Sequence, residues 1–212
     1  MFPLRSEMPT VTTVRIKGFL SGIITTVFEF TENIIQGVFT EDNILSLLKR
    51  KLGSEVRIRF YGDDIWVPMF GQEFTTTYAW ASHNVADLDT LDKNVSKQVL
   101  ADLKAKEKFD FMLVHMIGVD CAGHTYGSRS PQIERKLLDT ETFIEEVIRL
   151  MDQDTTLVVF GDHGMTEEGN HGGDTLLEMR TGVFAYQKKP FPLGKTYRAN
   201  LQKFNQMDKG MK

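Results

Sequence analysis

The chain has 212 residues, of which 41% are hydrophobic, and a formal net charge of −4. This length and apolar content suit one globular domain with a sizeable core, and the acidic balance gives no support to a nucleic-acid-binding class. The single cysteine, Cys121, excludes an internal disulfide.

In chain order, the first residues show no targeting or membrane signal. Residues 1–8 lack the apolar region of a signal peptide. The most apolar stretch, 18–30, is interrupted by polar residues and is shorter than the roughly 20 residues that a membrane-spanning helix needs.

Helix-like and strand-like patterns then alternate along the chain. Apolar periodicity and end signals predict helices over 41–52, 87–106 and Ser130 to Met151. β-rich or apolar runs predict strands over 56–61, 110–116, 155–160 and 182–186, with the second and third expected to be buried. This alternation predicts an α/β fold with a mostly parallel sheet flanked by helices. We expect residues 1–187 to form this domain and the Lys- and Arg-rich residues 188–212 to be a flexible tail.

Two glycine-rich segments contain most of the histidines, each close to an aspartate. The first carries Asp120 and His124, and the second carries Asp162, His163 and His171. Both follow predicted buried strands, and the carboxyl ends of strands in an open α/β sheet form its ligand-binding edge. We therefore expect the segments to converge. Histidine nitrogens and carboxylate oxygens of this number could hold two metal ions with open coordination positions.

The remaining histidines and the cysteine have simpler interpretations. His83 and His115 are expected to be surface or internally hydrogen-bonded residues. Cys121 lies inside the first glycine-rich segment, where a role as small filler is favoured over metal ligation.

A pair of metals suits phosphoryl transfer, which also needs a nucleophile. The threonine-rich stretch 9–15 offers several hydroxyl groups, and a threonine needs activation before it can attack phosphorus. Taken alone, this stretch indicates only the start of a helix.

These segments resemble the alkaline phosphatase superfamily and, within it, the GPI ethanolamine phosphate transferases. The resemblance covers roughly residues 9–186. It rests on 118–124, 161–174 and Pro9-Thr10-Val11-Thr12, with further similarity at 41–43, 61–66 and 84–92. It implies an alkaline-phosphatase-like sheet and points to Thr12, rather than Thr10 or Thr13, as the nucleophile.

The resemblance also implies two ligand sets. One metal, zinc by ligand type with manganese as the alternative, would be held by Asp120, His124 and His171. The second would be held by Asp162, His163 and the Thr12 hydroxyl. Thr12 would take phosphoethanolamine from phosphatidylethanolamine and pass it to the 6-hydroxyl of the third mannose of a GPI precursor. Three acidic residues are candidates for the ethanolamine head group, with plain turn residues as the alternative: Asp63, Asp64 and Asp174.

One departure from the family pattern affects the second metal. Members of the family have a further aspartate ligand on the first strand of the sheet, upstream of the nucleophile, whereas residues 1–8 contain no Asp. We therefore expect a truncated catalytic domain that lacks its first strand. Such a chain would keep the first metal site, bind the second metal weakly and be inactive.

Other interpretations remain open. The chain could instead resemble the sibling transferase that acts on the second mannose, a metal-dependent phosphodiesterase, or an inactive metal-binding module. The leading interpretation implies a lumenal catalytic domain at the endoplasmic reticulum membrane, anchored by segments absent from this sequence and assisted by a small membrane partner subunit. Asn94, in the sequon Asn94-Val95-Ser96, would then be a glycosylation site.

Overall fold

A computed structural model describes residues 2–24 and 38–189 of the chain. The described strands are β1 (Phe2–Arg5), β2 (Ile58–Asp63), β3 (Thr76–Trp80), β4 (Phe111–Val114), β5 (Thr156–Phe160) and β6 (Arg180–Gln187). The helices are α1 (Thr12–Ser21), α3 (Ile44–Leu52), α4 (Trp66–Phe70), α5 (Thr90–Lys104), α6 (Gly118–Tyr126), α7 (Pro131–Leu150) and α8 (Leu176–Met179), with a 3-10 turn, η1 (Gly71–Glu73).

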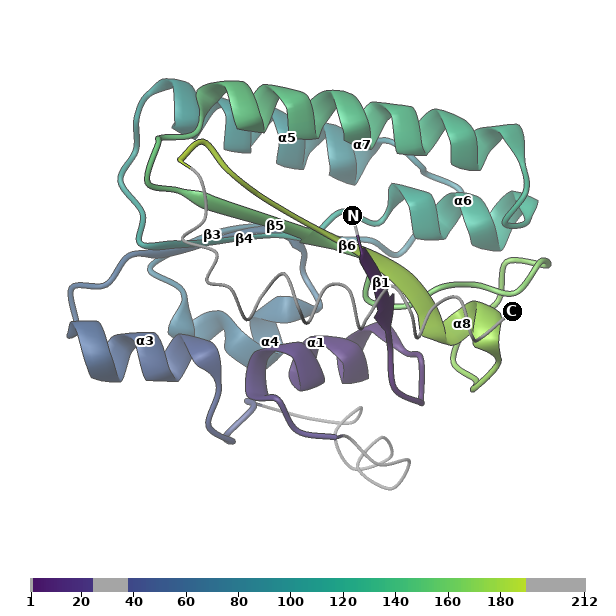
Figure 1. The fold of residues 1–212 in the computed structure, drawn as a ribbon, viewed down its shortest axis with the longest axis horizontal. Coiled ribbons are helices and arrows are strands. Elements are labelled where there is room, and N and C mark those ends of the chain that lie inside the picture. The colour runs from purple at the N-terminus through teal and green to yellow at the C-terminus, as the bar shows by residue number, and fades with distance from the viewer. Residues whose placement is uncertain (1, 25–37, 190–212) are drawn as a thin grey trace.

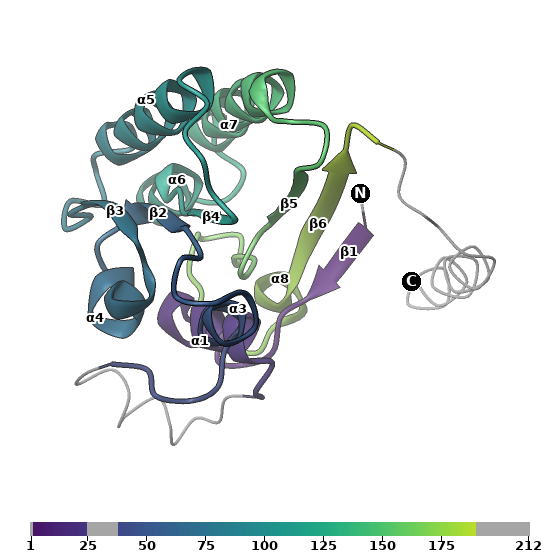
Figure 2. The same cartoon turned by 90° about the vertical axis from the view of Figure 1, so that its left-hand side faces the viewer.

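The strands form a central layer that helices cover on both sides (Figure 1). Helices α5, α6 and α7 lie on one side of this layer, and α1, α3 and α4 lie on the other (Figure 2). The strands belong to two three-stranded sheets, ordered β3-β2-β4 and β1-β6-β5. The predicted α/β fold with a parallel sheet flanked by helices is confirmed.

The parallel arrangement holds for the first sheet, where β2 pairs in parallel with both β3 and β4. In the second sheet, β6 runs antiparallel to both β5 and β1. The reason lies in the connections, because a parallel return needs a long crossover, usually a helix, on one face. Only a loop and the short helix α8 separate β5 from β6, so the chain turns back alongside β5.

Strand β1 has no counterpart among the predicted elements. It is short, contains Pro3, and lies at the edge of its sheet, where a proline is tolerated because no donor is needed on the outer side. It carries no aspartate. Its carboxyl end leads directly to the threonine-rich stretch and helix α1.

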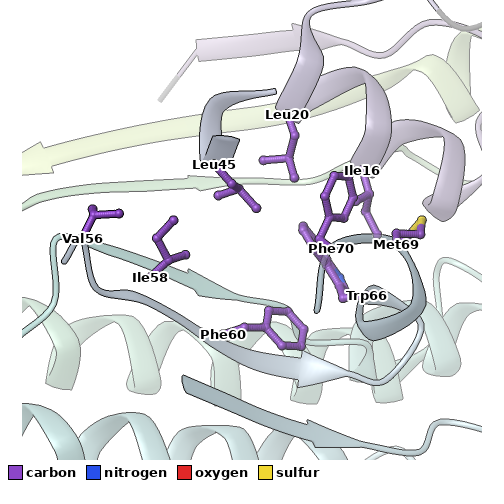
Figure 3. Close-up of a cluster of buried hydrophobic side chains, with 9 residues drawn as sticks. All are labelled: Ile16, Leu20, Leu45, Val56, Ile58, Phe60, Trp66, Met69 and Phe70. Atoms are coloured by element: carbon purple, nitrogen blue, oxygen red, sulfur yellow. The ribbon is translucent and has the colours of Figure 1, made fainter. Parts of the chain in front are cut away.

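Strand β2 is the centre of the core because all of its residues are buried. On one face, Phe60 joins a cluster with residues of α1, α3 and α4, shown in Figure 3. On the other face, Tyr61 packs with residues of α5 and with Phe143 of α7. Arg59 is buried on this strand and pairs with Asp102 of α5 at 3.2 Å.

The predicted helices and strands occur with shifted ends, and neither of the two strands expected to be buried is fully buried. Helix α3 begins at Ile44 rather than at 41, because Asn43 and Ser46 form a capping box that fixes the start. The prediction that strand 155–160 is buried is wrong: Val158 is 52% exposed and Phe160 44% exposed. Both β4 and β5 are edge strands, and β4 is likewise only partly buried.

Among the described helices, none combines the length and apolarity needed to cross a membrane. The apolar stretch 18–30 lies partly outside the described residues, as does nearly all of the predicted tail. The two tail residues within the description are anchored, since the Lys188 ammonium donates to the Met151 carbonyl at 2.6 Å and Lys189 pairs with Asp154.

Candidate metal centre

Helix α6 presents Asp120 and His124 one turn apart, on the same side of the helix. Its first turn is held by Asp92, whose carboxylate accepts hydrogen bonds from the backbone N–H groups of Ile117 and Gly118 at 3.0 and 3.2 Å. The Lys136 ammonium lies 2.8 Å from the same carboxylate, and both side chains are buried. A β-carbon at position 118 would collide with Lys136 and Asp92, so only glycine fits there.

The second glycine-rich segment leaves β5 and folds back against α6. Asp162 and His163 come first, and the loop then approaches so closely that a β-carbon on Gly169 would collide with the Gly123 carbonyl. Gly169 also has a φ of 86°, a left-handed conformation that favours glycine. The close approach brings His171 to the side chains of α6.

Asp120, His124 and His171 form a compact group of ligand atoms. The Nε2 atom of His124 lies 3.3 Å from one Asp120 oxygen, and the Nε2 atom of His171 lies 3.4 Å from the other. All three ligand atoms lie within 4.8 Å of one another. Tetrahedral zinc with bonds of about 2.1 Å separates neighbouring ligand atoms by about 3.4 Å, so these residues fit such an ion.

Asp162, His163 and Thr12 form an adjacent group. The Nε2 atom of His163 lies 3.4 Å from an Asp162 carboxylate oxygen and 3.3 Å from the Thr12 hydroxyl oxygen. Thr12 is the first residue of α1, which places its side chain at the start of that helix. The structure therefore brings together all six residues that the sequence suggested for this site.

Backbone carbonyls determine which ring nitrogen carries the proton when His163 and His171 are neutral. His171 Nδ1 lies 2.8 Å from the Thr10 oxygen, and His163 Nδ1 lies 3.0 Å from the Gly164 oxygen. A carbonyl oxygen can only accept, so in neutral rings Nδ1 carries the proton and Nε2 presents a lone pair. This is the usual arrangement of metal-binding histidines.

Two carboxylate oxygens at the site support the same interpretation. In the described part of the chain, Asp120 Oδ1 and Asp162 Oδ2 are buried without a hydrogen-bond partner. Each lies 3.4 Å from a histidine Nε2 atom, which in the neutral ring with the proton on Nδ1 has no proton to donate. Buried polar atoms rarely stay unpaired, so a group of unpaired lone pairs facing one another favours a cation between them.

Several residues that shape the site have no role in the interpretation made from the sequence. The Ser6 hydroxyl donates to the Asp162 carbonyl at 2.7 Å. Thr10 contacts the loop through its hydroxyl, which accepts from Gly172 N–H at 2.8 Å and donates to the Gly173 carbonyl at 2.9 Å. Glu178 accepts from Gly173 N–H at 2.7 Å. Only Glu178 had a local signal, the capping-box pattern Thr175-x-x-Glu178.

Other candidates lie outside the ligand groups. Cys121 is buried against Leu88 and Ala122, and burial raises its pKa to about 11, so it is a filler residue in this packing. Desolvation lowers the pKa of His115, against the opposing effect of nearby aspartates. Asp63 accepts a hydrogen bond from Ile65 N–H at 3.0 Å, the geometry of a turn residue. Asn94 lies within α5 and is partly buried.

A parallel sheet with Asp and His residues gathered after its strands is compatible with metal-dependent chemistry on phosphoesters. The chain belongs to the family described as Type I phosphodiesterase / nucleotide pyrophosphatase, whose match covers residues 36–203.

Within this family, the chain is similar to particular transferases. It is 36% identical over 186 residues to GPI ethanolamine phosphate transferase 3 of Saccharomyces cerevisiae, and 35% identical over 180 residues to GPI ethanolamine phosphate transferase 3, catalytic subunit, of Homo sapiens. It is 33% identical over 190 residues to GPI ethanolamine phosphate transferase 2 of Yarrowia lipolytica.

The first two matches cover 87% and 85% of this chain but only 18% and 16% of the relatives. The chain thus spans less than a fifth of their length. A solved structure, the PH0037 protein from Pyrococcus horikoshii, matches 66% of this chain and 39% of its own, with a TM-score of 0.46 and 16% identity, a likeness too slight to support an inference.

Proposed function

We propose that this chain is part of the catalytic domain of a GPI ethanolamine phosphate transferase and that Thr12 carries the phosphoethanolamine group during transfer. The observation that carries the proposal is the position of the Thr12 hydroxyl, 3.3 Å from His163 Nε2, an atom that also lies 3.4 Å from an Asp162 carboxylate oxygen. The names of the related transferases support the choice of transferred group.

The reaction would consist of two displacements at phosphorus. In the first, a bond forms between Thr12 Oγ and the phosphorus of phosphatidylethanolamine, the bond to the glycerol oxygen breaks, and diacylglycerol leaves with the threonine proton. In the second, a mannose hydroxyl oxygen attacks the same phosphorus, the bond to Thr12 breaks, and the mannose proton returns to Thr12. Dividing the transfer in this way is nucleophilic catalysis.

The side chains around Thr12 would prepare this chemistry. Asp120, His124 and His171 would hold one divalent cation, and Asp162 and His163 would contribute to a second. When bound, such cations make a hydroxyl more acidic and offset the negative charge of the phosphoryl oxygens. As the first residue of α1, Thr12 presents its hydroxyl to the second ligand group, 3.3 Å from His163 Nε2.

The names of the relatives support one choice of acceptor and of cellular setting. The chain is 34–36% identical to several transferases of type 3 and 30–33% identical to several of type 2, which favours the third mannose over the second. We further propose that the whole protein acts at the lumenal face of the endoplasmic reticulum membrane with a small membrane partner subunit.

Trapping of the group on Thr12 tests the proposal. A chimera in which residues 9–187 replace the matching segment of the yeast relative is incubated with phosphatidylethanolamine labelled in its ethanolamine. We expect label on the Thr12 peptide, its loss in Thr12→Ala, and its retention in Thr13→Ala. Label that persists in Thr12→Ala would remove Thr12 from the mechanism.

Hydrolysis is a second candidate function, favoured by the description of the family as phosphodiesterases. The same chimera separates the two functions when the GPI acceptor is omitted. Steady release of free phosphoethanolamine would indicate a hydrolase. Transfer of the label to an added GPI precursor, with no free phosphoethanolamine released in its absence, would indicate a transferase.

A further inference from the structure

Thr10 connects two parts of the site that are far apart in the sequence. It is fully buried and lies two residues before Thr12, immediately ahead of helix α1. Three hydrogen bonds join it to the glycine-rich loop around His171, more than 160 residues further along the chain.

The side chain of Thr10 fixes the backbone of this loop. Its hydroxyl accepts from Gly172 N–H at 2.8 Å and donates to the Gly173 carbonyl at 2.9 Å, so both functions of the hydroxyl are used. Gly172 has a φ of 114°, a conformation that few other residues adopt. Because glycine can adopt many backbone conformations, this loop needs hydrogen bonds from residues outside it to stay in one of them.

The backbone of Thr10 fixes the ring of His171. The Thr10 carbonyl oxygen lies 2.8 Å from Nδ1, which holds the proton there and turns Nε2 toward Asp120. The same residue thus orients the third ligand of the metal centre and carries the chain into the helix that begins with Thr12.

We infer that Thr10 is a positioning residue that sets the distance between the metal centre and the nucleophile. Without its hydroxyl, the Gly172–Gly173 backbone would lose both contacts, and His171 would be held less firmly toward Asp120. This inference rests on the proposed function only for the role of Thr12. Its consequence for metal binding is independent of any transfer activity.

Zinc affinity of the complete chain tests the inference, measured by competition with a chromogenic chelator. Thr10→Val keeps the size of the side chain and removes the hydroxyl. Loss of a group that orients a metal ligand typically weakens affinity about 10–100-fold, and we expect an effect of that size. Thr10→Ser keeps the hydroxyl and should bind zinc as tightly as the unmodified chain.

Thr13→Val is the matched control. The Thr13 hydroxyl lies in the same stretch and is buried, but has no hydrogen-bond partner among the described residues. We expect this variant to keep its zinc affinity. Equal affinities of Thr10→Val and Thr13→Val would overturn the inference.

A measurement on the unmodified chain covers the case in which Thr10→Val does not fold. Without metal, the Gly172 amide should exchange slowly with deuterated solvent, because it donates to a buried hydroxyl. Rapid exchange of this amide in an otherwise protected fold would contradict the inference. A chimera that shows no transfer while Thr10→Val still weakens zinc binding would count against the proposed function alone.

Discussion

The imidazole rings of His163 and His171 are stacked, with centroids 3.9 Å apart and planes 21° from parallel. The two histidines belong to different ligand groups, one with Thr12 and Asp162 and the other with Asp120. Their contact makes the two groups neighbours, so that two cations and the nucleophile would share one small region. This proximity is what a two-metal displacement at phosphorus requires.

The first prediction concerns metal stoichiometry. We expect the 212-residue chain to bind one zinc ion tightly and a second weakly, because three protein ligands converge in the first group and residues 1–8 offer no aspartate for the second. His171→Ala should abolish tight binding, whereas Asp162→Ala should leave it intact. Metal analysis after dialysis checks this, and two tightly held ions with transferase turnover would contradict it.

The second prediction concerns the buried pair that supports α6. Lys136→Met removes the cation beside Asp92 and leaves a buried carboxylate poorly compensated. We expect a loss of about 3–5 kcal/mol in the free energy of unfolding, measured with urea. Lys93→Met removes an exposed ion pair with Asp89 and should cost only about 0–1 kcal/mol. Similar losses in both variants would show that the buried pair stabilises the fold no more than the exposed pair does.

The third prediction concerns Cys121. Its pKa of about 11, raised mainly by burial, keeps the thiol protonated and unreactive at neutral pH. We expect slow alkylation of the folded chain at pH 8 and rapid alkylation in urea. Cys121→Ala should leave zinc affinity unchanged, and a loss of zinc affinity in this variant would indicate that the thiol is a metal ligand.

The fourth prediction concerns the acid side of the stability curve. Hydrogen bonds from the Arg57 side chain and backbone lower the pKa of Asp110 to about 2. The pKa of Asp110 is lower in the folded chain than in the unfolded chain, where it is about 4, so the ionised carboxylate stabilises the fold above about pH 4. This contribution is lost as the pH falls toward 2. NMR titration of the Asp110 carboxyl should show the low midpoint. Arg57→Met should raise this midpoint only part of the way, because the backbone N–H of residue 57 still donates to the carboxylate.

The sequence predicts the broad architecture well because its signals are local. Periodicity located the helices and strands, and the position of Asp120 and Asp162 just after strands correctly predicted that the two segments converge, although their strands belong to two sheets rather than one. The direction of β6 and the pairing of β1 were not predictable in this way, since they depend on partners distant in the chain. The role of Thr10 was equally hidden, because its hydrogen bonds reach residues that no local pattern relates to it.

The division of the strands into two sheets affects how a bound metal ion would stabilise the fold. Asp120 and His124 follow β4 of one sheet, whereas His171 follows β5 of the other, and the two sheets have separate hydrogen-bond ladders. An ion bound by all three side chains would therefore cross-link segments that follow strands of the two different sheets. Free zinc should then raise the unfolding temperature, because it binds the folded chain in preference to the unfolded chain, and a chelator should reverse this rise.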